Sequence, residues 1–165
     1  MDPFTIISGL AAVLQLCGTA RAVVKVAHRF SRNAGGASAD VRRFAIQVQI
    51  FSDVVEAAEF SLQSYCTKNQ KSPLVVFIHS RGILDNIGEE AKAVQEHLRD
   101  IRARVRSLGS SSILWASIKW TWNKSSILEL VPEMESVKGS LSLLAAISGF
   151  EERTGAGRNA SDEEM

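Results

Sequence analysis

The most constraining feature of the sequence is an apolar segment at its start. The eighteen residues from Pro3 to Ala20 contain no charged side chain. Such a segment can be a secretion signal, a buried core helix, or a helix that leaves the core and enters a membrane. A signal peptide carries positive charge before its apolar region, whereas Asp2 precedes this one and the first basic residue, Arg21, follows it. We therefore expect one of the other two roles.

The segment has properties of both a core helix and a membrane helix. Leu10, Val13 and Cys17 share one face and Leu16 adds a second, so we expect a core helix with neighbours on all sides. Eighteen residues at about 1.5 Å each span about 27 Å, slightly less than a hydrocarbon core of about 30 Å. Gly9 and Gly18 would let inserted copies pack closely. The sequence alone leaves both roles open.

Composition indicates one ordinary globular domain. The chain has 165 residues, of which 22% are charged and 45% hydrophobic, values typical of a folded domain. A net charge of +1 gives no overall attraction to nucleic acid or anionic lipid. Two cysteines, Cys17 and Cys66, are too few for a disulfide framework and lie in apolar patterns, so we expect reduced, buried thiols in a cytoplasmic protein.

Three further stretches repeat apolar residues every three or four positions, the spacing of one helix face. The first covers 41–65. The second opens at Ser72 with a side-chain cap followed by proline, and Gly82 or Gly88 is expected to bend or break it. The third covers 127–144, with Pro132 expected to kink it and Gly149 to end it.

The remaining segments complete the predicted architecture. Residues 110–126 contain Trp115, Trp120 and Trp122 and are expected to form a separate short helix. Short connectors favour antiparallel neighbours. The prediction is an all-α, antiparallel bundle of four long helices plus a short Trp-containing helix over residues 1–150. Residues 151–165 are expected to be a disordered tail or the start of a linker.

Three stretches carry a resemblance to a known family: "MDPFTIISGLAAVLQLCGTARAVVKVAHRF", "SADVRRFAIQVQIFSDVVEAAEF" and "ILWASIKWTWNKSSILELVPEMESVKGSLSLLAAI". In this order they resemble the HeLo-like N-terminal domain of fungal NLR-like (STAND) proteins, over roughly residues 1–150. The match in the last stretch includes Trp120, Glu135, Lys138, Ser140 and Leu141. The group is related in kind to mixed-lineage kinase-like and plant coiled-coil cell-death bundles.

The resemblance implies a cell-death effector or signalling domain of fungal innate immunity. It implies self-association, NLR-type receptor domains as possible partners, and a cytoplasmic protein that becomes membrane-associated on activation. The implied inserting segment is Pro3 to Ala20, with the candidate residues Phe4, Ile6, Ile7, Leu10, Val13, Leu14 and Leu16. The alternative is a purely structural domain that oligomerises or recruits a partner without membrane activity.

The sequence offers no catalytic, cofactor-binding or metal-binding candidates, and we expect no enzyme. His28, His79 and His97 lie in separate contexts with no ligand spacing around them. Two basic clusters are candidates for contact with anionic lipid, although cations at helix ends and on solvated faces give the same pattern. Their residues are Arg21, Lys25, Arg29, Arg99, Arg102 and Arg106. Nothing favours nucleic-acid binding.

Overall fold

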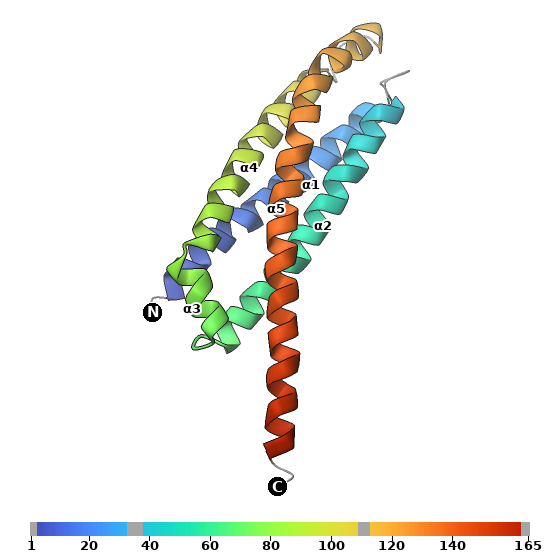
Figure 1. The fold of residues 1–165 in the computed structure, drawn as a ribbon. Coiled ribbons are helices and arrows are strands. Elements are labelled where there is room, and N and C mark those ends of the chain that lie inside the picture. Colours follow the sequence, from blue (N-terminus) through green and yellow to red (C-terminus); the bar gives the residue numbers. More distant parts are fainter. Residues whose placement is uncertain (1–2, 33–37, 109–112, 163–165) are drawn as a thin grey trace.

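The computed structural model describes the backbone of residues 3–32, 38–108 and 113–162, and side chains over 9–32, 38–107 and 124–155. All regular structure in these ranges is helical, which confirms the predicted all-α class (Figure 1). The elements are α1 (Pro3–Ser31), α2 (Ser38–Lys68), α3 (Pro73–Ser80), α4 (Ile83–Leu108) and α5 (Ile113–Asp162).

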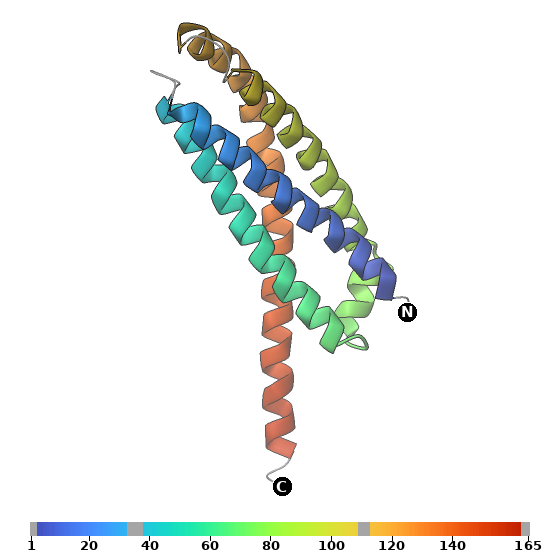
Figure 2. The ribbon, with the colours of Figure 1, turned by 180° about the vertical axis from the view of Figure 1, so that it is seen from behind.

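The four long helices pack around a shared core. α1 packs against α2 and α4, and α5 packs against the same two helices. Opposite views show α1 on one side of the α2–α4 pair and α5 on the other (Figures 1 and 2). The lower end of α5 extends beyond the rest of the bundle (Figure 1).

Only some neighbouring helices are antiparallel. α1 and α2 are antiparallel, and so are α4 and α5. In contrast, α1 and α4 run parallel: Gly9 lies against Gly88, and ten residues further on Thr19 accepts a hydrogen bond from Gln95 at 3.1 Å. The expectation of antiparallel neighbours concerned helices joined by short connectors, and α1 and α4, which run parallel, are not joined in this way. Instead, α3 carries the chain across the end of the bundle, so α4 starts beside the start of α1 (Figure 1).

α2 and α5 are the second parallel pair. At their beginnings Lys124 lies 3.5 Å from Asp40 in an ion pair, and further along both helices Tyr65 donates a hydrogen bond to Glu151. These contacts lie 25 residues apart on α2 and 27 apart on α5, which is possible only for parallel helices. The two pairs joined directly by short connectors, α1–α2 and α4–α5, are antiparallel as expected, whereas α1–α4 and α2–α5, which are not consecutive in the chain, are parallel.

The break between α3 and α4 follows the predicted glycine. Ser72 caps α3 by accepting a hydrogen bond from the Val75 N–H at 3.1 Å, and Pro73 occupies the first helical position, where its missing N–H leaves no bond unmade. Gly82 has φ +59, a left-handed conformation that glycine adopts readily, and α4 begins at the next residue. Gly88 lies inside α4 and does not interrupt it.

α5 differs from the prediction at both ends. The segment with Trp115, Trp120 and Trp122 belongs to α5 and is not a separate helix; its side chains lie outside the described residues. α5 also continues through Gly149. Among the described glycines, only Gly82 has the positive φ typical of a helix-ending glycine. Residues 151–162, expected to be a disordered tail or linker, are helical in the structure.

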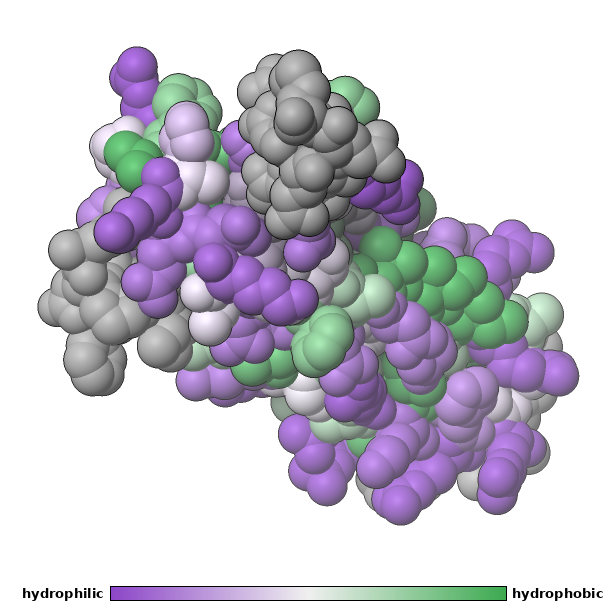
Figure 3. Space-filling view, turned by 90° about the horizontal axis from the view of Figure 1, so that it is seen from below, coloured by the Kyte–Doolittle hydropathy of each residue, from purple (hydrophilic) through white to green (hydrophobic). Residues whose placement is uncertain are grey.

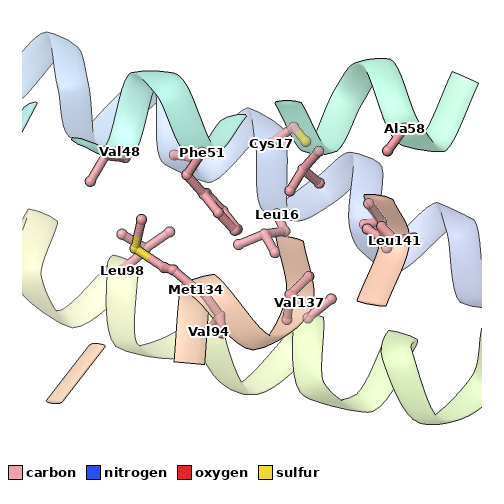
Figure 4. Packing of buried hydrophobic residues seen from close by; sticks show 14 of the residues in the cluster. Leu16, Cys17, Val48, Phe51, Ala58, Val94, Leu98, Met134, Val137 and Leu141 are labelled. Atoms are coloured by element: carbon pink, nitrogen blue, oxygen red, sulfur yellow. The ribbon is translucent and has the colours of Figure 1, made fainter. Parts of the chain in front are cut away.

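The core contains the predicted apolar faces. The apolar positions spaced three or four residues apart in 41–65 and 127–144 are all buried: Val41, Phe44, Val48, Phe51, Val55, Ala58, Leu62 and Tyr65, and Ile127, Leu130, Met134, Val137, Leu141 and Leu144. In Figure 4, Phe51 of α2 points into the space between Leu16 of α1 and Met134 of α5. The core therefore joins α1, α2 and α5.

Two leucines on α5, Leu141 and Leu143, test this assignment. Leu141 is fully buried, whereas Leu143 is 61% exposed. Leu141→Asp should lower the free energy of unfolding by more than about 4 kcal/mol, because it places an unpaired charge in the core. The control Leu143→Asp should change it by less than about 0.5 kcal/mol. Denaturant titration followed by circular dichroism measures both, and equal effects would contradict the assigned core face.

Candidate functional site

The candidate inserting residues fall on different sides of α1. Leu10, Val13 and Leu16 are buried against α2 and α4, whereas Leu14 is 46% exposed. The side chains of the other three candidates, Phe4, Ile6 and Ile7, lie outside the described residues. The exposed side of α1 continues through other residues, which are Gln15, Gly18, Arg21 and Lys25. The expectation of a helix with neighbours on all sides is therefore wrong: α1 has two packed sides and one open side.

α1 is long and apolar enough to cross a membrane. The apolar span is Gly9–Ser31, and half of its most apolar 18-residue stretch is buried in the bundle. A core helix of a soluble protein meets the same criteria of length and composition. The span therefore permits insertion and does not by itself require it.

Two glycines set how closely α1 approaches α4. A Cβ atom on Gly9 would overlap the backbone carbonyl of Leu84, with the carbonyl carbon only 2.8 Å away. A Cβ atom on Gly88 would lie 3.1 Å from the Cα of Gly9. Gly18, in contrast, faces open space. Gly9 therefore has a packing role in the bundle that the sequence analysis did not recognise, since identifying it requires knowing which helix crosses α1.

The contact between α1 and α2 is built around a buried thiol. The Cys17 thiol donates a weak hydrogen bond to the Ser52 carbonyl at 3.8 Å, and the Ser52 hydroxyl donates to the Cys17 carbonyl at 3.5 Å. Burial is the main cause that raises the pKa of Cys17 to about 11, so the thiol stays protonated at neutral pH. One turn further, exposed Arg21 forms an ion pair with Glu56 of α2.

Glu59 is a buried acid on the same helix. It is 3% exposed, and its Oε1 atom has no hydrogen-bond partner among the described residues. Burial raises the pKa of its carboxyl above the ordinary 4.5, and the nearby Glu56 raises it further. The burial of Glu59 could have been predicted from the sequence, because Glu59 lies four residues after Val55 and three before Leu62, both fully buried.

The basic candidates form two rows. Arg21, Lys25 and Arg29 follow one another at four-residue spacing on α1 and are exposed. Arg99, Arg102 and Arg106 lie on one side of α4, because spacings of three and four residues return to the same helix face. In the α4 row, Arg99 and Arg106 are exposed, whereas Arg102 is partly buried and its Nε atom has no partner among the described residues. Of the three candidates on α4, Arg99 and Arg106 are thus the ones that can reach an anionic lipid surface.

A shallow groove of about 340 Å³ lies between α2 and α5. Its floor is mainly apolar, and the Lys124–Asp40 ion pair lies at its rim. The lining residues are Asp40, Arg43, Phe44, Gln47, Lys124, Ile127, Leu128, Val131 and Pro132. In the part of the chain that the structure describes, no three His, Cys, Asp or Glu residues are placed to hold a metal ion.

No protein-family model, curated protein or solved structure matches this chain. The HeLo-like resemblance therefore rests on the quoted sequence stretches alone. Function has to be argued from α1, the basic rows and the exposed surfaces.

Removing the charge of Glu59 should stabilise the domain in a pH-dependent way. An acid whose pKa is higher in the folded state destabilises the fold once pH exceeds its unfolded value, here 4.5. Glu59→Gln should therefore raise the free energy of unfolding by about 1 kcal/mol at neutral pH, and the gain should vanish below pH 4.5. Denaturant titrations across pH measure this, with exposed Glu152→Gln as the control. A gain independent of pH would show that ionisation of Glu59 is not its cause.

Reversing the two exposed arginines of the Arg99–Arg102–Arg106 row should weaken attraction to anionic vesicles. Each basic residue near such a surface contributes about 1 kcal/mol, while exposed charges contribute little to folding. Arg99→Glu with Arg106→Glu should keep the melting temperature within a few degrees and reduce vesicle co-sedimentation at low salt. Unchanged co-sedimentation would show that these residues only interact with solvent.

Proposed function

We propose that this chain is a HeLo-like cell-death effector domain that self-associates and acts on anionic membranes through α1. In this proposal it is cytoplasmic at rest, is controlled by NLR-type receptor domains and becomes membrane-associated on activation. The alternative, a domain that oligomerises or recruits a partner without acting on lipid, predicts a different outcome for the experiment below.

The observation that carries the proposal is the position of α1. It is long and apolar enough to cross a membrane, and it packs only on one side of the α2–α4 pair. α5 packs on the other side of the same pair. Departure of α1 would therefore leave α2, α4 and α5 joined through α5.

Energetics require that release of α1 be coupled to another event. Among the described side chains of α1, six large apolar ones are buried: Leu10, Val13, Leu16, Val23, Val24 and Phe30. Each contributes about 1.5–3 kcal/mol when buried, so exposing them to water would cost on the order of 10 kcal/mol. Transfer into lipid would remove most of this cost, and contacts between copies would cover the uncovered faces of α2 and α4. In this proposal, both the membrane and self-association are needed because each covers apolar surface that release of α1 would otherwise expose to water.

The glycines of α1 allow a matched test. Gly9→Ala should force α1 away from Leu84 and weaken its packing by about 1–3 kcal/mol, which raises the released population about 5- to 150-fold. Gly18→Ala adds the same methyl group to the same helix where nothing lies within 4 Å, and should stabilise the fold by up to about 1 kcal/mol. The measurement is the rate of dye release from anionic liposomes, with circular dichroism to confirm folding.

The proposal expects faster leakage with Gly9→Ala and leakage no faster than the parent with Gly18→Ala. Deleting residues 2–5 should abolish leakage, because it shortens the helix by about 6 Å. If neither the parent nor Gly9→Ala releases dye while the protein still self-associates, the alternative without membrane activity is correct.

A further inference from the structure

The outward side of α2 carries an apolar stripe that no other described helix covers. Ile46, Ile50 and Val54 follow at four-residue spacing and are exposed, with Ile50 53% exposed. They lie away from the core side of α2, since Val48, Phe51 and Val55 in the same turns are buried whereas these three residues are exposed. Figure 3 shows a continuous hydrophobic surface on the side of the molecule where Figure 1 places α2.

The charges around this stripe favour a protein partner over a lipid surface. A helix that lies on an anionic membrane has basic residues along its polar flanks. Here Arg42 and Arg43 stand only at one end, and the acidic Asp53 lies beside the stripe and accepts a hydrogen bond from Gln49 at 2.8 Å. Beyond the other end stands an exposed aromatic ring, Phe60.

We propose that this stripe is the surface through which two copies of the domain pair, with their α2 helices antiparallel and a two-fold axis at Ile50. The inference rests on the self-association in the proposed function and assigns its surface. In this arrangement Ile46 lies opposite Val54 of the second copy, and Ile50 lies opposite Ile50. A parallel arrangement would set Arg43 against Arg43 and Asp53 against Asp53, and such like-charge contacts are destabilising.

The same register gives Phe60 a partner. With the axis at Ile50, Arg42 of one copy lies level with position 58 of the other, two residues from Phe60. A helical side chain points toward its own N-terminus, which directs the Arg42 guanidinium toward that ring. A guanidinium over an aromatic face is favourable. In the single domain, Arg42 donates two local hydrogen bonds to Ser38 on the same helix, one to its hydroxyl at 3.0 Å and one to its backbone carbonyl at 3.4 Å.

The size of the stripe makes this a weak interface. A stable dimer buries about 800 Å² on each partner, and three partly exposed aliphatic side chains supply only part of that area. Pairing is therefore concentration-dependent, and a receptor that gathers several copies would drive it. A domain that must be inactive until gathered requires this property.

Replacement of the central residue tests the surface. Ile50→Glu should weaken association at least about tenfold in sedimentation velocity, with the melting temperature unchanged because the side chain is already exposed. Leu143→Glu adds the same charge at a similarly exposed leucine on α5 and should associate like the parent. A parent that stays monomeric at all concentrations, an Ile50→Glu variant that associates like the parent, or equal loss in both variants would overturn the proposal.

Cross-linking tests the orientation. Ile50→Cys should form a disulfide-linked dimer under mild oxidation, because the two copies meet at this residue, whereas Arg43→Cys should not. The native thiols, Cys17 and Cys66, are buried and do not compete. Self-cross-linking of Arg43→Cys without that of Ile50→Cys would overturn the antiparallel arrangement.

Experiments with lipid vesicles distinguish a failure of this inference from a failure of the proposed function. Pairing through the stripe without dye release would support the inference and contradict the membrane function. Loss of vesicle binding in Ile50→Glu, with solution association unchanged, would show that the stripe contacts lipid and would overturn the pairing.

Discussion

The close approach of α1 to α4 at Gly9 and Gly88 is the contact on which the arrangement of the bundle depends. Two backbones can approach this closely only where neither residue carries a Cβ atom. The contact fixes the start of α4 beside the start of α1, so the two helices run parallel. α3 must then cross the end of the bundle, and α5 is left to cover the other side of α2 and α4.

The interactions in and around the α1 contact include both stabilising and destabilising contributions to folding. Apolar burial along Leu10, Val13 and Leu16 is favourable. On the neighbouring helix, however, Glu59 is buried without a partner for one of its oxygens in the described region, which opposes the fold at neutral pH. A helix held mainly by apolar contacts finds equivalent surroundings in lipid, so the same interactions that stabilise the resting bundle make its release into a membrane physically reasonable.

The two proposed surfaces lie on different parts of the molecule. α2 contacts α1 on one face and α5 on another, and its apolar stripe lies on the side that remains. Pairing through Ile50 would therefore leave the open side of α1 uncovered. Association of copies and release of α1 are thus separable steps, and gathering copies first would concentrate their α1 helices before any of them leaves the bundle.

The sequence by itself determined the helical class and the core positions of the central helices, because burial on a helix follows from spacing along the chain. It predicted a bend or break at Gly82 or Gly88 without choosing between them. It also identified α1 as the apolar helix, but it did not separate the buried Val13 from the exposed Leu14 that follows it. Only the tertiary structure decided that difference, together with the parallel pairs, the continuity of α5 and the exposure of Ile50. Each of these depends on which helix lies beside which, and local spacing carries no information about that.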